Sequence, residues 1–160
     1  MPILHLQFSA QRQTPNGQTV NLPPSAALLG QGPTVPVVLS VAQTIADQLM
    51  QQGLTVPTPV SGSALIDTGA SQTCIDDAID QQLQLPVIDV VNMTSASHAS
   101  TQQNIYPVLI EVVGGIRINV PRAMGANLAS QSLAALIGRD FLQRCTLFYN
   151  GPSGLITLAL

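Results

Sequence analysis

The chain has 160 residues, enough for one domain with a hydrophobic core and too few for two comfortable ones. Its net charge is -3, and its five basic residues, all arginine, form no basic patch, which argues against nucleic-acid binding. No apolar stretch approaches the ~20 residues of a membrane span, and no basic segment followed by an apolar run opens the sequence. We therefore expect no membrane insertion and a soluble, cytoplasmic protein.

Charged residues make up only 8% of the chain and hydrophobic residues 46%. The surface must then be covered largely by amides, hydroxyls and apolar atoms, which favours a protein that associates with itself. The two cysteines, Cys74 and Cys145, lie far apart, with no Cys-x-x-Cys spacing and no histidine pair nearby. They are read as small buried hydrophobic residues, and no metal or cofactor is expected.

Residues 1–60 are predicted to form an N-terminal extension with short elements of its own. Residues 3–8 alternate as a strand does, whereas the prolines and glycines at 23–36 predict a loop. A strand rich in valine follows at 35–41, and the period changes to that of a helix at 42–52. This patterning favours an additional layer of the fold over a propeptide.

An apolar run at 64–66 is bounded by turn residues and ends on a carboxylate, Asp67. The run predicts a buried strand, at the end of which a charge is costly unless it is hydrogen-bonded, paired or protonated. The next four residues, 68–71, are small, so the backbone can fold tightly around the acid and direct N–H groups at its oxygens. Asp67 is therefore the candidate catalytic group, with an acid that merely caps a turn as the alternative.

The segment 74–85 combines apolar residues at helical spacing with three acids, Asp76, Asp77 and Asp80. It predicts a helix whose first turn carries acids, where the helix dipole favours them. A metal site or a glycosidase site is the alternative. Acids in an exposed first turn are, however, usually a solvated cap.

Two strands, at 87–93 and 105–113, are joined by a small, polar segment at 94–101. This pattern predicts a projecting hairpin, whose tip can close over a ligand through its backbone N–H groups. An ordinary mobile loop is the alternative.

The last part of the chain predicts further short elements. Strands are expected at 116–120, 146–149 and 155–158, and an apolar run at 133–138 leads into a short helix at 139–142. The whole chain is therefore predicted to be mainly β, with one or two short helices in this second part and a further helix in the N-terminal extension.

Taken together, the segments 65–71 (Leu-Ile-Asp-Thr-Gly-Ala-Ser), 94–101, 109–112 and 135–142 (Ala-Leu-Ile-Gly-Arg-Asp-Phe-Leu) resemble the retropepsin-like aspartic proteases in order and spacing. The resemblance covers roughly residues 60–150. It implies the closed β-barrel of the acid protease fold in a single domain, 1–160, with the protease core at 60–150 and the extension at 1–60.

The resemblance also implies a role for each residue that matches the family's motifs. The implied catalytic residues are Asp67, Thr68 and Gly69; the substrate-binding residues are Ala70, Ser71 and, at the tip of the hairpin, Ser97, His98 and Ala99; the supporting residues are Gly138, Arg139 and Asp140. Because the chain holds one such motif, Asp67 is expected to meet Asp67 of a second copy in a homodimer. The Thr68 hydroxyl would hold the two loops together, and Gly69 would leave room for the substrate backbone.

The implied activity is that of an endopeptidase acting on peptide or protein substrates without a cofactor. Two carboxylates ~3 Å apart share one proton, so that one activates water while the other hydrogen-bonds the scissile carbonyl. An acidic to mildly acidic optimum is expected. Two alternatives stay open: a dimerisation or peptide-binding module with the same fold, and a hydrolase that uses the acids at 76–80.

Overall fold

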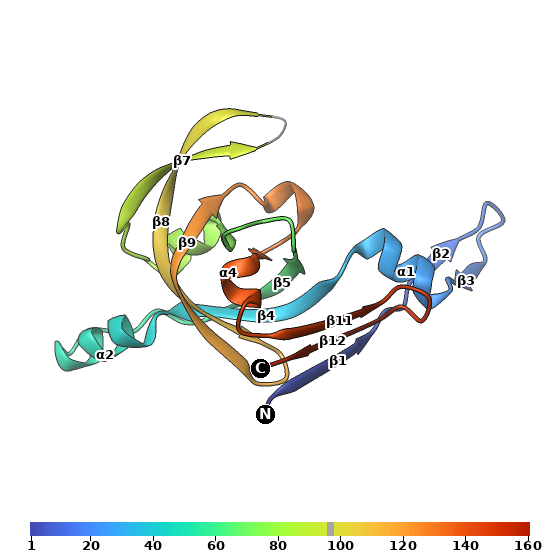
Figure 1. Ribbon diagram of the computed structural model, residues 1–160, viewed down its shortest axis with the longest axis horizontal. Coiled ribbons are helices and arrows are strands. Elements are labelled where there is room, and N and C mark those ends of the chain that lie inside the picture. Colours follow the sequence, from blue (N-terminus) through green and yellow to red (C-terminus); the bar gives the residue numbers. More distant parts are fainter. Residues whose placement is uncertain (96–97) are drawn as a thin grey trace.

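Six strands close into a barrel in the computed structural model, which describes residues 1–95 and 98–160 and the side chains of 1–93 and 101–160 (Figure 1). In order around the ring they are β4 (Thr34–Val41), β5 (Val60–Ile66), β10 (Ala135–Ile137), β6 (Cys74–Asp76), β9 (Ile116–Ala126) and β8 (His98–Val112). The ring closes because β4 pairs with β5 on one side and with β8 on the other. The predicted mainly-β fold with a closed barrel is confirmed.

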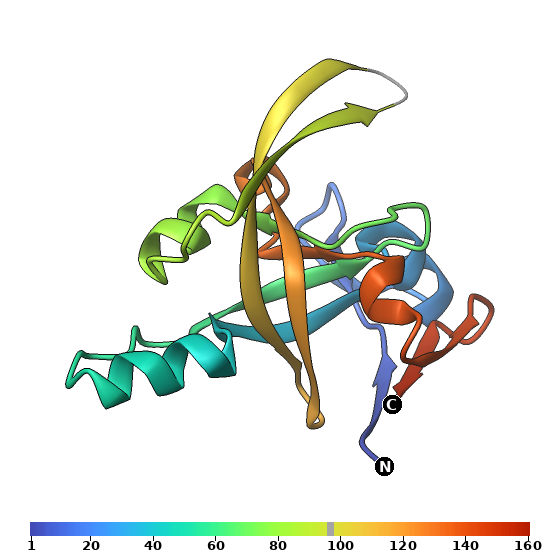
Figure 2. The same ribbon diagram turned by 60° about the vertical axis from the view of Figure 1, so that its left-hand side comes forward.

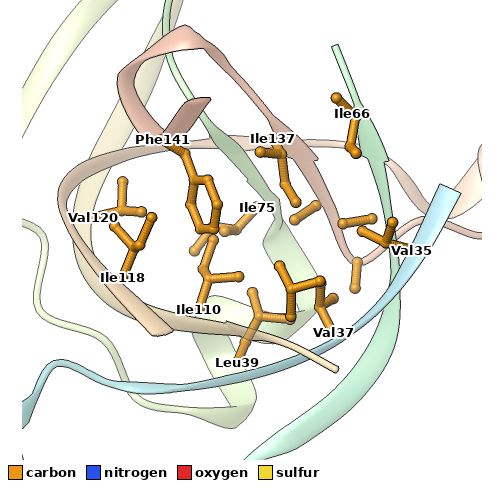
Figure 3. Packing of buried hydrophobic residues seen from close by; sticks show 14 of the residues in the cluster. Val35, Val37, Leu39, Ile66, Ile75, Ile110, Ile118, Val120, Ile137 and Phe141 are labelled. Carbon is orange, nitrogen blue, oxygen red and sulfur yellow. The ribbon is translucent and has the colours of Figure 1, made fainter. Parts of the chain in front are cut away.

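The barrel is filled by the apolar side chains that alternate along its strands, as the two-residue period of a strand requires. On β4 these are Val35, Val37 and Leu39, which are buried while their neighbours are more exposed. Figure 3 shows them facing side chains from the other strands. The ring of Phe141 lies among these side chains and is completely buried, so the short helix that carries it is fixed to the barrel.

A second sheet lies beside the barrel and joins the two ends of the chain (Figure 1). Its order is β1 (Ile3–Gln7), β12 (Leu155–Ala159) and β11 (Thr146–Asn150), all antiparallel. Gly154 has φ +60, and a Cβ there would lie 2.2 Å from the carbonyl oxygen of Pro24, so the chain at Pro24 packs tightly on the C-terminal hairpin. We propose that residues 1–160 form one domain in which the extension is an integral layer.

The first sixty residues contain two helices. The prediction of a loop at 23–36 is therefore wrong. Helix α1 (Pro24–Gln31) occupies part of it, with Pro24 in the first turn and Gly32, at φ +68, after the last. Proline is well suited to the first turn of a helix and glycine to its end, so these residues mark boundaries rather than a loop. The predicted second helix is present as α2 (Gln43–Gln51); it projects away from the barrel (Figures 1 and 2) and has no buried residue.

The helix predicted at 74–85 is shorter than expected. Only α3 (Asp77–Gln82) is helical, because residues 74–76 are strand β6, which pairs with β10 and β9 inside the barrel. Further along, η1 (Ala129–Gln131) and α4 (Arg139–Leu142) complete the helical elements of this half. A small hairpin, β2 (Gln11–Gln13) with β3 (Thr19–Asn21), lies near the start of the chain.

The predicted projecting hairpin is formed by β7 (Asp89–Ser95) and the first part of β8. Strand β8 begins before residue 105, where the sequence predicts its start. The two strands pair from Asp89 opposite Ile105 to Ser95 opposite His98. Figures 1 and 2 show that they arch over the end of the barrel at which β5 ends. None of the described helices is long and apolar enough to cross a membrane.

Candidate active site

Asp67 directly follows β5 and is half-buried at the end of the barrel. Its backbone N–H donates to the carbonyl of Ile137 at 3.0 Å, which continues the parallel pairing of β5 with β10. The end of β10 therefore lies beside the acid. This pairing brings Gly138, about 70 positions further along the chain, to the loop that follows Asp67.

The loop after Asp67 folds back on the carboxylate. Its Oδ1 accepts hydrogen bonds from the backbone N–H groups of Gly69 at 2.8 Å and Ala70 at 3.2 Å. A Cβ at Gly69 would lie only 3.1 Å from this oxygen, so a larger residue would crowd it. The backbone donors predicted for this acid are confirmed, and they offset part of its desolvation.

Arg139 ties this loop to α4. Its Nη1 donates to the carbonyls of Thr68 at 2.8 Å and Gly69 at 2.7 Å, and its backbone N–H donates to Ala70 at 3.0 Å. The charged group thus hydrogen-bonds carbonyl oxygens rather than a carboxylate. Arg139 fixes the shape of the loop from behind and leaves the other face uncovered, since Thr68, Gly69 and Ser71 are exposed.

Thr73 is a second anchor of the loop that sequence reasoning missed. It is 0% exposed, and its Oγ1 donates to Asp140 Oδ1 at 2.7 Å while accepting from the N–H of Gly138 at 3.1 Å. A Cβ at Gly138 would lie 2.5 Å from the carbonyl carbon of Gln72, so only glycine fits here. A threonine before an apolar strand carries no signal of this role; only the meeting of β6 with β10 reveals it.

The structure therefore brings together eight of the eleven residues that the sequence singled out: Asp67, Thr68, Gly69, Ala70, Ser71, Gly138, Arg139 and Asp140. The other three are predicted for the tip of the hairpin. Ser97 lies outside the described residues, and His98 and Ala99 are described as backbone of β8 only.

The acids at 76–80 are not the solvated cap that the sequence predicts. Asp76 is 6% exposed and Asp80 8% exposed, and only Asp77 lies on the surface. The reason is that Asp76 ends a barrel strand: its Oδ1 accepts from Ala78 N–H at 2.9 Å and its Oδ2 from Leu128 N–H at 2.8 Å. Asp76 therefore caps α3 and fixes the start of η1.

The thiol of Cys74 lies close to the acids of the loop. Burial raises its pKa to about 11, and the Asp140 and Asp67 carboxylates add to the rise, so the thiol is neutral near pH 7. Among the described residues, no group of three or more His, Cys, Asp or Glu side chains could hold a metal ion.

Among solved structures, three resemble the chain at low identity. A foamy viral protease-reverse transcriptase, solved with an RNA/DNA hybrid, is 15% identical with a TM-score of 0.44; the match covers 70% of this chain and only 12% of that one. A retropepsin-like aspartic protease from Rickettsia conorii is 13% identical with a TM-score of 0.41, covering 78% and 90% of the two chains. The retroviral protease-like domain of Ddi1 from Leishmania major is 14% identical with a TM-score of 0.39, covering 73% and 81%.

No curated protein matches the sequence significantly. Residues 59–144, more than half of the chain, match the sequence profile of a family described as "gag-polyprotein putative aspartyl protease". The matched segment includes the Asp67 loop, the arching hairpin and α4. The chain therefore belongs to this family of retropepsin-like aspartyl proteases.

Proposed function

We propose that the protein is an aspartic endopeptidase that acts as a homodimer, with one Asp67 from each copy in the active site. The observation that carries the proposal is the Asp67 loop itself. One carboxylate oxygen is held by two backbone N–H groups, and the loop is braced by Arg139 from behind. The chain has one Asp-Thr-Gly sequence, so a second acid has to come from a second copy.

The exposed face of the loop supports this assembly. Thr68 and Gly69 are exposed, so they are free to contact the same loop of a second copy across a two-fold axis. In the proposed dimer the Thr68 hydroxyl joins the two loops, and Gly69 leaves space for the backbone of a bound peptide. Gly138, Arg139 and Asp140 act as support only.

Substrate binding is proposed for the rim of the loop and for the hairpin. Ala70 and Ser71 follow the acid directly, and the strands β7 and β8 arch over the same end of the barrel (Figure 2). In this arrangement Ser97, His98 and Ala99 form the tip that closes on a peptide. Backbone N–H groups at such a tip suit an extended peptide, whose carbonyls need donors.

The proposed mechanism follows from the repulsion between two close carboxylates. Two such groups ~3 Å apart hold one proton between them. The ionised acid takes a proton from a bound water, which attacks the scissile carbonyl carbon while the protonated acid hydrogen-bonds the carbonyl oxygen. The acid that took the proton from water then gives it to the leaving amine as the C–N bond breaks.

The test compares wild type with Asp67→Asn on a mixture of denatured proteins between about pH 3 and 8. We expect wild-type cleavage to follow a bell-shaped pH profile with an acidic to mildly acidic optimum. Asp67→Asn should lose activity by about 10³-fold or more while sedimentation still shows a dimer. Asp47→Asn, an exposed acid on the projecting helix α2, is the matched control and should cleave as wild type does.

Other results would assign a different function. Cleavage by both wild type and Asp67→Asn would move the chemistry to other acids, such as those at 76–80. Cleavage by neither, with an intact dimer, would leave a peptide-binding or dimerisation module. A flat pH profile would contradict the shared proton, and a monomer that still cleaves would contradict the pairing of two Asp67 residues.

A further inference from the structure

A polar recess of about 400 Å³ lies between α3 and the middle of β8, away from the Asp67 loop. Asp77 and Asp80 from α3, Asn104 and Tyr106 from β8, and three glutamine side chains line it. Among the described residues, none that lines this recess is basic. The recess therefore offers two carboxylates and several amide oxygens without a positive charge to balance them.

Asp80 is the unusual member of this set. It is only 8% exposed, and its Oδ1 has no hydrogen-bond partner among the described residues. A buried polar atom of this kind costs free energy in proportion to the hydrogen bonds that it lacks. Because Asp80 also lines the recess, a group that enters it lies next to this carboxylate.

Two residues of β8, Asn104 and Tyr106, line the recess together with Asp80. Asn104 Nδ2 donates to the Tyr106 hydroxyl at 3.1 Å, which leaves the Asn104 carbonyl oxygen as an acceptor. Burial raises the pKa of Tyr106, and a hydrogen bond from its hydroxyl to the Asp80 carboxylate raises it further, so the phenol stays neutral beside the acid. Asp80 Oδ1 is the oxygen that lacks a partner among the described residues. Burial likewise raises the pKa of Asp77, and Asp80 and Asp76 raise it further.

Gly125 of β9 lies next to two of the residues that line the recess, Asp77 and Tyr106. A Cβ at this position would lie 2.9 Å from Asp77 Oδ1 and 3.1 Å from the Tyr106 ring, so glycine allows both side chains to approach the strand. The arginines that pair with acids do so elsewhere: Arg117 with Glu111, and Arg122 with Asp89. The negative charge of the recess is thus a feature of this place and not of the whole surface.

We propose that this recess binds the guanidinium group of an arginine side chain in a peptide or protein ligand. The guanidinium would donate to Asp80 and Asp77 and to the side-chain carbonyl oxygen of Asn104. A guanidinium fits better than an ammonium group because it has five N–H donors in a plane and is weakly hydrated.

The proposal stands apart from the proposed protease activity, because Asp67 does not line the recess. It does have a consequence for that activity. Strand β8 runs from the recess into the arching hairpin, so an arginine bound here would lie at the base of the hairpin. The recess would thus add a contact for basic ligands outside the active site.

The test is an NMR titration of the full chain with Nα-acetyl-arginine amide, and with Nα-acetyl-citrulline amide as its neutral isostere. We expect the arginine probe to give saturable shifts at the backbone amides of α3, Asn104 and Tyr106 at millimolar concentration. The citrulline probe should bind about tenfold or more weakly. Equal shifts with both probes, or no saturable shift, would overturn the proposal.

Variants locate the site. Asp80→Asn and Asp77→Asn should each weaken the arginine probe, Asp80→Asn by about tenfold or more, and Asp47→Asn on α2 should leave its affinity unchanged. Undiminished affinity in Asp80→Asn would refute the assignment. If Asp80→Asn does not fold, Asp77→Asn and the comparison of the two probes on wild type still decide. Because no readout depends on peptide cleavage, an inactive protein would not affect the result.

Discussion

Two acids of the same barrel, Asp67 and Asp80, differ in their burial and in the hydrogen bonds that their Oδ1 atoms accept. The carboxylate of Asp67 is half-buried, and its Oδ1 accepts two backbone hydrogen bonds. That of Asp80 is more deeply buried, yet its Oδ1 accepts none from the described residues. The region around Asp67 is held by several hydrogen bonds, whereas the region around Asp80 leaves one carboxylate oxygen without a partner among the described residues.

The difference shows that burial alone does not identify a reactive acid. The loop of Asp67 is braced by Arg139 and Thr73, so the acid is held in one geometry with an exposed face in front of it. Such preorganisation suits chemistry. Asp80 is instead suited to binding, since a ligand that supplies donors gains the hydrogen bonds that the fold lacks.

The largest expected effect tests how tightly the Asp67 region is packed. Gly138→Ala places a Cβ 2.5 Å from the carbonyl carbon of Gln72, and the backbone would have to move. We expect the free energy of unfolding, measured by urea denaturation, to fall by about 3 kcal/mol. Gly30→Ala is the matched control, because nothing lies within 4 Å of its added Cβ and Gly30 is in helix α1.

The control should be as stable as wild type or more stable by up to about 1 kcal/mol, since alanine favours a helix. If Gly138→Ala were equally stable, the loop would be able to yield, and the contrast between the two regions would fail.

A smaller effect is expected at Asp76 than at Gly138, and Asp80 in the same segment is its comparison. Both oxygens of Asp76 accept hydrogen bonds, whereas Oδ1 of Asp80 accepts none from the described residues. Asp76→Asn replaces a carboxylate that accepts from Ala78 and Leu128, so we expect the free energy of unfolding to fall by about 2 kcal/mol. Asp80→Asn removes a buried charge with an unpartnered oxygen, so stability should stay the same or rise slightly. Urea denaturation of both variants at one pH measures the difference. A loss on Asp80→Asn as large as that on Asp76→Asn would show that Asp80 already has its partners.

The smallest expected effect is a change in the pKa of the Cys74 thiol, which depends on the charge of Asp67. With the pKa of Cys74 at about 11, roughly one thiol in a thousand is ionised at pH 8. A disulfide reagent should then label Cys74 slowly in a Cys145→Ser variant. In Cys74→Ser, the half-exposed Cys145 should react faster. Adding Asp67→Asn should lower the pKa of Cys74, since one of the charges that raise it is gone; an unchanged absorbance titration of the thiolate would contradict that coupling.

Much of the fold could be predicted from the sequence because local patterns and tertiary packing agree there. The strand that ends at Asp67 and the C-terminal hairpin are read from apolar runs bounded by turn residues. The helix α1 was missed because proline and glycine stand at helix ends as well as in loops. The sequence predicts a helix at residues 74–76 because three residues are too few to distinguish the 3.6-residue period of a helix from the two-residue period of a strand.

The candidate site was predicted in part for the same reason. Asp67 and the segment from Gly138 to Asp140 form local motifs, and their meeting follows from the resemblance. Thr73 and the recess around Asp80 depend on contacts between residues far apart in the sequence, such as Asp80 with Tyr106. No local pattern encodes such contacts, and the burial of Asp76 and Asp80 follows only from the short strand before them.

The pairing of β1 with β12 also bears on the order in which the protein folds. Leu4 lies opposite Leu158, and the N–H of Phe8 donates to the carbonyl of Gly154 at 2.8 Å. These contacts close a loop of almost the whole chain, which is slow and entropically costly. During synthesis β1 must wait for β12, so the second sheet is complete only once residues 155–159 have left the ribosome.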